Sequence, residues 1–152
     1  MSGALELRIV TPLEIAAEEP ALLVAGEDAT GRFAILPRHE DFLTVLTVSV
    51  LRWRTPEGRE RFAAVRGGVF EVTGGRRVQV ATPEAVLSDR LEELWPRVVE
   101  RMRREAERMA VERTAMARLE LAVVRSLRDY LEARRRPVAL GGPGSVRGGR
   151  GP

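Results

Sequence analysis

The sequence predicts a β-sandwich N-terminal domain, followed by an α-helical hairpin or extended helices and a disordered tail. From Ala4 to Ala81, short runs of alternating apolar residues end in turn residues roughly every eight to twelve positions, a pattern typical of an antiparallel sandwich or barrel. After Thr82, apolar residues recur at the three- and four-residue spacing of an amphipathic helix. After Pro137 the chain is rich in Gly and Pro and too poor in apolar residues to order itself.

These observations divide the chain into three parts. We expect a β-sandwich domain at residues 1–82, a C-terminal helical region at 83–136 and a disordered Gly/Pro-rich tail at 137–152. A length of 152 residues fits one small domain with an appendage. Aromatic residues make up only 5% of the chain, so the core is expected to be mostly aliphatic.

The β part contains eight predicted strands joined by recognisable turns. The strands are expected at residues 5–10, 13–18, 21–25, 32–36, 48–54, 61–65, 68–72 and 76–81. Tight hairpins are predicted at 55–58 and 73–76, where Pro and Gly supply the backbone angles that short connections need. The pair Gly67-Gly68 is expected to be a turn or bulge, because no helix start and no Lys-Ser/Thr pair follows it as in a phosphate loop.

The helical part is expected to begin at Thr82-Pro83-Glu84, which combines a capping residue, a proline suited to the first helical position and an acid near the positive end of the helix dipole. Pro96 predicts a kink or a restart. The apolar stripe weakens around residues 110–114, where we expect a break. Two helices folded together would bury their stripes against each other, whereas one extended helix would need a partner, and the sequence permits both.

The composition excludes several kinds of chemistry. All 25 basic residues are arginine, cysteine is absent and His39 is the single histidine. Lysine Schiff bases, thiolate nucleophiles, disulfides and paired-histidine metal sites are therefore excluded. His39 follows a Pro-Arg turn and is expected to be a hydrogen-bonded structural residue. We expect no catalytic, cofactor-binding or metal site.

The helical region is basic. Residues 97–136 contain twelve arginines and seven acidic residues, a local net charge of +5. Pairs four residues apart, such as Glu100 with Arg104, account for part of this pattern as a solvated surface. Arginine forks that bind carboxylates bidentately would equally explain a helix that docks on an acidic partner. Charge alone leaves both interpretations open.

Several motifs in order resemble one known family. Residues 31–44, GRFAILPRHEDFLT, resemble the stretch G-E-F-G-I-L-P-G-H-A-P-L-L-T of the epsilon subunit of F-type ATP synthases. Residues 65–72, VRGGVFEV, are similar to that family's V-S-G-G-F-L-E-V, and residues 78–82 and 7–12 are similar to its closing and opening strands. The order and spacing agree over residues 5–136. The chain departs from the family's motifs at several positions, among them Arg66. In these departures it resembles the divergent epsilon subunits of an alternate, sodium-linked bacterial branch.

The resemblance implies a function. Epsilon is a non-catalytic subunit of the central stalk, whose β-domain packs on the gamma subunit and contacts the c-subunit rotor ring. Its helices lie folded on the β-domain or extend along gamma, where they meet acidic segments of the alpha and beta catalytic subunits and block ATP hydrolysis. The resemblance therefore places the chain peripherally on the cytoplasmic side of the inner membrane, in contact with the membrane only through the complex.

The resemblance also indicates candidate sites. The rotor-ring and gamma interface is expected at Gly31, Arg32, Phe33, Arg38, His39, Glu40 and Asp41. Arg32 stands where the family usually has an acid, so the charge pairing with the ring is expected to be altered. The inhibitory helix is expected to act through Arg113, Arg118, Arg125 and Arg128. Some epsilon subunits bind ATP through the motif I/L-D-x-x-R-A, which residues 87–91 do not fit, so no nucleotide is expected.

A second interpretation from a different class is a nucleic-acid-binding or adaptor module with a basic helical arm. Binding through such an arm would weaken steeply with salt. The predicted strands lack the regularly placed aromatic residues on which bases stack. We therefore expect no nucleic-acid partner.

Overall fold

The computed structural model describes residues 3–135, so the predicted tail at 137–152 lies outside the described residues. The chain divides into two compact units on either side of the Met109–Ala110 bond. The elements in chain order are β1 (Leu5–Val10), β2 (Ile15–Ala21), β3 (Leu23–Asp28), β4 (Gly31–Ile35), β5 (Phe42–Arg54), β6 (Glu60–Thr73), β7 (Arg77–Ala81), β8 (Ala85–Ser88), the 3₁₀ turn η1 (Leu91–Glu93) and α1 (Arg97–Arg135).

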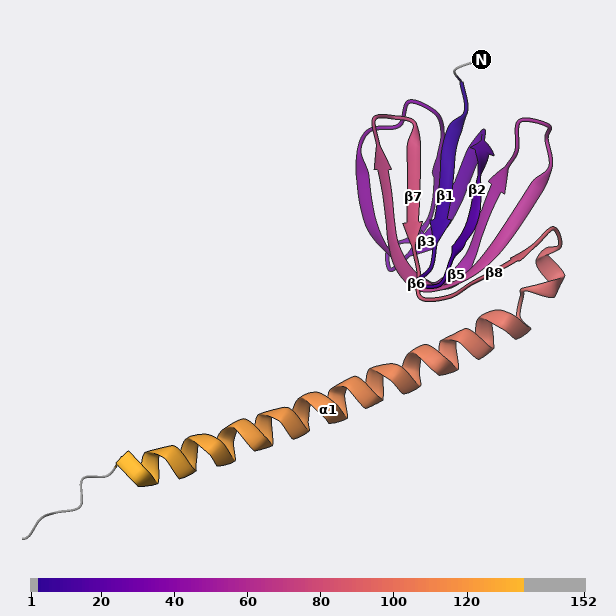
Figure 1. Ribbon diagram of the computed structural model, residues 1–152. Coiled ribbons are helices and arrows are strands. Elements are labelled where there is room, and N and C mark those ends of the chain that lie inside the picture. Colours follow the sequence, from indigo (N-terminus) through magenta and orange to yellow (C-terminus); the bar gives the residue numbers. More distant parts are fainter. Residues whose placement is uncertain (1–2, 136–152) are drawn as a thin grey trace, which may run out of the picture. The chain divides into compact units, whose positions relative to one another are not determined.

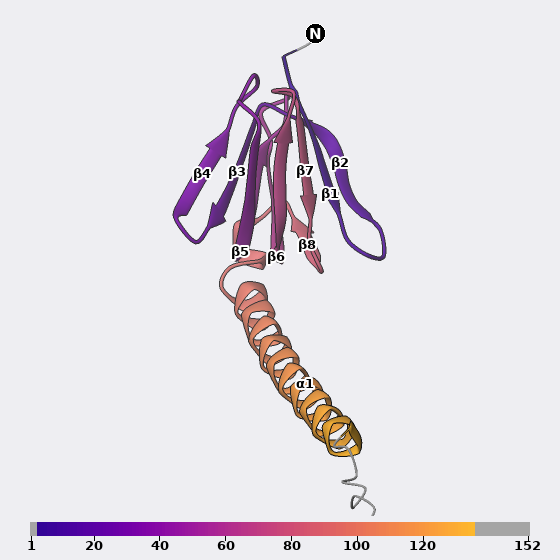
Figure 2. The same ribbon diagram turned by 90° about the vertical axis from the view of Figure 1, so that its left-hand side faces the viewer.

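The strands form the predicted β-sandwich, in which the long strands β5 and β6 belong to both layers. The hydrogen-bonded order is β2-β1-β7-β6-β5-β3-β4, with β8 added beside β6. The first half of β6 pairs with β8 and its second half pairs with β7. Figure 2 shows the result, with β3 and β4 on one side of β5 and β6, and β1 and β2 on the other.

The long strands pass from one layer to the other near two adjacent glycines. Gly67 and Gly68 have φ angles of 72° and 119°, which side chains with a Cβ rarely adopt. The pairing of β6 with β5 nevertheless continues through Gly68, which lies opposite Leu46. The prediction of two separate strands at 61–65 and 68–72 was therefore wrong, as was the late start of β5 at Val48.

The core lies between the two layers and is mostly aliphatic, as predicted. Alternate residues of β1 point into it, with Leu5, Leu7 and Ile9 all buried. The few aromatic residues are concentrated, since Phe33, Phe42 and Phe70 form one cluster with ring centroids 4.9 to 6.3 Å apart. Both predicted hairpins are confirmed, because β5 pairs with β6 and β6 pairs with β7 across the turns at 55–58 and 73–76.

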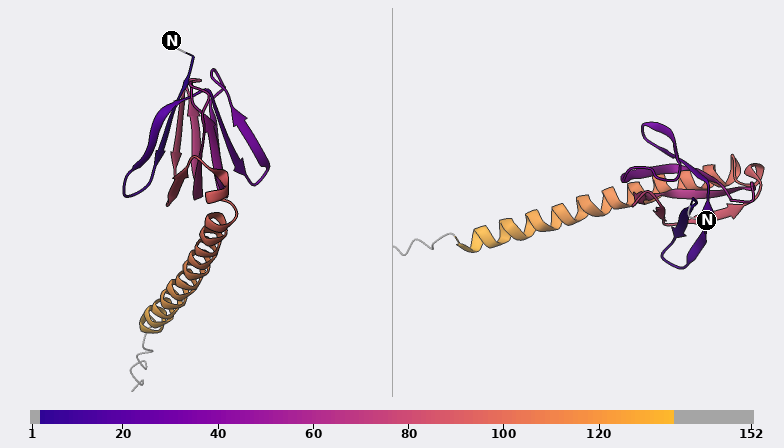
Figure 3. Two further views of the ribbon diagram at one scale, coloured as in Figure 1. Left: turned by 90° about the vertical axis from the view of Figure 1, so that its right-hand side faces the viewer. Right: turned by 90° about the horizontal axis from the view of Figure 1, so that it is seen from above.

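The predicted helix start at Thr82 was wrong. The Thr82 hydroxyl donates to the backbone oxygen of Glu84 at 3.1 Å within a turn, and the next residues form β8. The local capping signal is overridden because β8 pairs with residues 62–65 of β6. The prediction of a restart at Pro96 is confirmed, since η1 ends before this proline and α1 begins directly after it (Figure 3).

The predicted break at residues 110–114 was also wrong. Helix α1 continues through this segment, and the Thr114 hydroxyl donates to the Ala110 carbonyl oxygen at 2.9 Å, as serine and threonine do inside helices. Of the two predicted alternatives, the single extended helix is the one observed (Figure 1). Within residues 3–135, no helix is long and apolar enough to cross a membrane.

Candidate interaction surfaces

The loop before β5 holds His39 in a structural role. Its Nδ1 lies 2.7 Å from the backbone oxygen of Glu40. Because a carbonyl oxygen only accepts hydrogen bonds, this nitrogen carries the proton. The imidazole also packs edge-on against Phe42 at 5.9 Å between ring centroids. Among residues 3–135 no group of three or more His, Asp or Glu side chains is placed to hold a metal ion.

The predicted interface residues 38–41 lie at one end of the sandwich and are hydrogen-bonded to the β6–β7 turn. The Arg38 amide donates to the Gly75 carbonyl oxygen at 2.7 Å. The Gly74 amide donates to the Asp41 carboxylate at 3.0 Å. Arg38 adopts a positive φ of 68°, and a Cβ on Gly75 would lie only 2.9 Å from its Cα. The loop is therefore fixed by its contact with two glycines of the neighbouring turn.

Gly31 begins β4, directly after the turn that joins β3 to β4. Asp28 accepts hydrogen bonds from the Thr30 amide at 2.9 Å, the Thr30 hydroxyl at 2.6 Å and the Thr44 hydroxyl at 2.7 Å. These hydrogen bonds, chiefly those from Thr30, lower the pKa of the Asp28 carboxyl below its usual value. The carboxylate thus ties the turn to the neighbouring strand β5.

The structure does not bring all seven predicted interface residues together. Strand β4 separates Gly31 from the loop at 38–41, and its five residues span about 16 Å. Phe33 packs against the core through Phe42 and Phe70. Arg32 is exposed and lines a groove of about 630 Å³ on the outer face of β3, β4 and β5, which Arg52, Phe62, Trp95 and Arg103 also line.

An exposed apolar patch lies on β5 and β6, and sequence reasoning missed it. Leu43 and Val45 are 68% and 70% exposed, and Val69 lies directly opposite Val45. Within the described chain, residues 42–45 pair only with β6, so the other edge of this strand segment is open. Large apolar side chains beside open backbone groups are features of a protein-binding surface. The signal in the sequence is the run from Phe42 to Leu46, in which both faces of the strand carry apolar residues and Thr44 is the one polar position.

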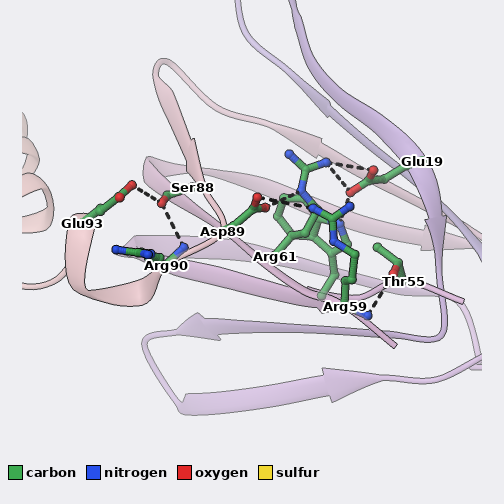
Figure 4. A network of polar contacts seen from close by, with 9 residues as sticks. Glu19, Thr55, Arg59, Arg61, Ser88, Asp89, Arg90 and Glu93 are labelled. Atoms are coloured by element: carbon green, nitrogen blue, oxygen red, sulfur yellow. Dashed lines mark hydrogen bonds and ion pairs between the residues drawn. The ribbon is translucent and has the colours of Figure 1, made fainter. Parts of the chain in front are cut away.

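A polar network fixes the corner where the chain leaves the sandwich (Figure 4). The Arg61 guanidinium donates to both oxygens of Glu19 at 2.9 Å and to Asp89 at 3.2 Å. Glu19 also accepts from the indole of Trp53, and Arg59 pairs with Asp89 at 3.4 Å. The network joins β2, β5 and β6 to the residue that follows β8. In residues 87–91, which do not fit the ATP-binding motif, Asp89 is therefore paired with Arg59 and Arg61.

The predicted inhibitory arginines lie on the part of α1 that belongs to the second unit. Arg113, Arg118, Arg125 and Arg128 are all exposed, and within residues 3–135 none of them forms an ion pair. Arg118 and Arg125 are seven residues apart and share one face of the helix. A different face carries apolar residues, among them Met116, Val123 and Leu127, each at least half exposed. The distal helix is thus amphipathic.

Comparison with known proteins agrees with this architecture. Residues 4–88 match the family model described as the beta-sandwich domain of the ATP synthase delta/epsilon chain. The protein named ATP synthase epsilon chain 2 of Cereibacter sphaeroides is 44% identical over 133 residues, which cover 85% of this chain and 89% of that protein. Its namesake in Paraburkholderia xenovorans is 39% identical over 136 residues, with coverages of 89% and 98%.

A solved structure shares the fold. A chain in the cryo-EM structure of the Euglena gracilis mitochondrial ATP synthase, OSCP/F1/c-ring, superposes with a TM-score of 0.54 at 22% identity, covering 56% of this chain and 54% of that one. The fold and the family match define the class of this chain, a subunit with the β-sandwich domain of the ATP synthase delta/epsilon chain. The family model matches residues 4–88, and two epsilon chains are 44% and 39% identical over most of this chain. The chain therefore belongs to the epsilon subunits of F-type ATP synthases. As a member of this family, the chain is a non-catalytic subunit of the ATP synthase complex.

Proposed function

We propose that the chain couples the gamma subunit to the c-subunit rotor ring in the central stalk, peripherally on the cytoplasmic side of the inner membrane. The observation that carries this proposal is the patch of Leu43, Val45 and Val69 beside the open edge of β5. A subunit that transmits torque needs a rigid domain with a surface that binds its partner firmly. The patch lies on the two longest strands, which span both layers of the sandwich.

The gamma subunit is the partner that we assign to this patch. Burying three large aliphatic side chains contributes about 1.5–3 kcal/mol each, and the open strand edge adds backbone hydrogen bonds in the manner of β-augmentation. The nearby surface of residues 38–41 is fixed by Gly74 and Gly75 and forms the candidate contact with the rotor ring. Arg32, at the end of β4 far from this loop, presents a positive charge to an acidic residue of the ring.

The experiment is a mixture of the full chain with purified gamma at micromolar concentration, separated by size-exclusion chromatography. The wild-type chain should elute with gamma. The double variant Leu43→Glu/Val45→Glu should elute alone, because two buried charges would be left unpaired. Leu13→Glu is the matched control, since Leu13 is 96% exposed on the distant β1–β2 turn. Separate elution of the wild-type chain, or equal loss with Leu13→Glu, would contradict the proposal.

The same proposal assigns an inhibitory role to the distal part of α1. Its arginines have no acidic partners within the described chain and suit carboxylates on the alpha and beta subunits. Replacing Arg113, Arg118, Arg125 and Arg128 together by Gln should raise ATP hydrolysis of the assembled enzyme severalfold. Arg134→Gln/Arg135→Gln, which removes two charges near the end of the same helix, serves as the control and should leave hydrolysis unchanged. Unchanged hydrolysis in the fourfold variant would remove the inhibitory role and leave the coupling role standing.

A further inference from the structure

The first turns of α1 pack on the outer face of the β-domain, and these contacts all lie within the first unit. Val99 and Met102 are completely buried. They contact Leu94 ahead of the helix and, from β6, Phe62 and Ala64. These two strand residues point away from the main core, because their neighbours Ala63 and Val65 point into it. The start of α1 therefore closes a second, smaller core.

A cluster of four charged residues stands beside this second core. Arg66 of β6 pairs with Glu105 of α1 at 3.0 Å. Arg101 of α1 pairs with Glu105 at 2.9 Å and with Glu84, between β7 and β8, at 2.8 Å. The Arg66 amide also donates to the Glu84 backbone oxygen at 3.1 Å. Two guanidinium groups and two carboxylates thus alternate and link the helix to two segments of the β-domain.

The cluster is partly covered, so solvent screens it less than an exposed ion pair. The side chain of Arg66 is 18% exposed, and its Nε is buried without an acceptor within the described chain. A buried donor without a partner costs free energy. The ion pair with Glu105 offsets this cost and holds the Arg66 guanidinium in place. The hydrogen bond from Arg101 lowers the pKa of Glu105, and the one to Glu84 raises that of Arg101. Arg66 also stands where the resembling motif has serine.

The helix changes character directly after the cluster. Glu105 and Ala106 are half-buried, and every residue from Glu107 to Arg135 is exposed. The boundary between the two compact units follows three residues later, at Met109. The contacts that hold α1 on the β-domain therefore end within two turns of Met102.

We propose that Arg66 fastens the start of α1 to the β-domain, so that residues 97–105 stay docked in every state and any rearrangement of the helix occurs beyond Ala106. The regulatory meaning of this division rests on the proposed inhibitory function, whereas the fastening itself is a property of the free chain. The consequence is that the helix does not swing from Pro96. An inhibitory helix anchored in this way contacts the catalytic subunits only through residues 107 onward.

The absence of cysteine from the chain makes site-directed spin labelling straightforward. Nitroxide labels at Gln79→Cys and Arg104→Cys place one probe on β7 and one on the docked turns, both at exposed positions without ion pairs in the described chain. The full chain should give one narrow distance distribution by pulsed EPR, and adding gamma should leave it unchanged. A broad distribution in the free chain, or a shift on adding gamma, would overturn the proposal.

The role of Arg66 is tested in the same labelled chain. Arg66→Ala should broaden the distribution and raise amide hydrogen exchange of residues 99–105 about tenfold, the factor expected from losing one charged hydrogen bond. Arg66→Gln keeps the apolar stem, removes the charge and should show the same two changes. It therefore tests the role of Arg66 even if Arg66→Ala fails to fold. Arg97→Gln, an exposed position on the same turns, is the control. Unaltered exchange in both Arg66 variants would overturn the assignment. If gamma fails to bind while the distribution stays narrow, the proposed function fails and the fastening stands.

Discussion

Gly68 lies so close to Ala81 that a Cβ on the glycine would stand 2.1 Å from the alanine carbonyl oxygen. This contact joins β6 to the end of β7 at the point where β6 passes between the two layers. The φ of Gly68 is 119°, a region that residues with a side chain rarely adopt. Close approach and backbone angle therefore both require glycine at this position.

We predict that Gly68→Ala destabilises the β-domain by about 4 kcal/mol or more, because backbone atoms must move to admit the methyl group. Gly58→Ala is the matched control. It also has a positive φ, at 85°, but nothing lies within 4 Å of its Cβ position. It should cost about 1–2 kcal/mol for the backbone strain alone. Urea denaturation followed by circular dichroism measures both, and equal losses would contradict the argument from close approach.

The polar network at the start of η1 gives the second prediction. Arg61→Ala removes a bidentate partner of Glu19 and one of the partners of Asp89. Because Glu19 is partly buried, its charge would be left poorly compensated, and we expect a loss of about 1–3 kcal/mol in the free energy of unfolding. The companion variant Arg54→Ala loses only an exposed contact of 3.7 Å to Glu60 and should cost less than about 0.5 kcal/mol. Thermal denaturation measures the loss of stability in each variant, and equal losses in Arg61→Ala and Arg54→Ala would contradict the prediction.

Most strands of the sandwich could be predicted because alternation and turn residues are local signals. The failures at β6 and β8 share one cause. Gly67-Gly68 and Thr82-Pro83-Glu84 carry local signals for a turn and a helix start, and in both places pairing with strands distant in sequence decides the outcome. The contact between Arg66 and Glu105 joins residues 39 positions apart, and no periodic pattern indicates it.

The candidate surfaces were harder to predict than the fold. Leu43 and Val45 alternate with Phe42 and Leu46, which are also apolar, so the sequence does not distinguish the exposed face from the buried one. The proximity of Arg38–Asp41 to Gly74 and Gly75 depends on the β6–β7 turn lying beside this loop. The sequence does indicate the segment, residues 31–44, that leads into the patch, and its role as an interface stays a prediction.

The lowered pKa of Asp28 predicts an effect of pH. Its folded pKa lies below the unfolded value of 3.8, because Thr30 and Thr44 donate to the ionised carboxylate. The stabilisation is therefore complete above pH 3.8 and is lost as the pH falls through the lower folded pKa. Asp28→Asn should unfold more easily than wild type at pH 6, and the difference should shrink as the pH falls toward 2. Urea midpoints measured across this range test the prediction, and a constant difference would contradict it.

The second core beneath α1 gives the last prediction. Met102 is completely buried between the helix and β6, whereas Met109, two turns later, is 38% exposed. Met102→Ala should cost about 2–5 kcal/mol, because it leaves a cavity that the surrounding strands cannot fill. Met109→Ala should cost clearly less, since this side chain is 38% exposed and lies outside the second core. The exposed Trp95 lies just before the helix with Arg103 stacked at 5.4 Å, whereas Trp53 is buried, so acrylamide quenching reports mainly on Trp95. Quenching should rise in Met102→Ala and stay unchanged in Met109→Ala, and equal quenching in the two variants would mean that the helix start is not held by this core.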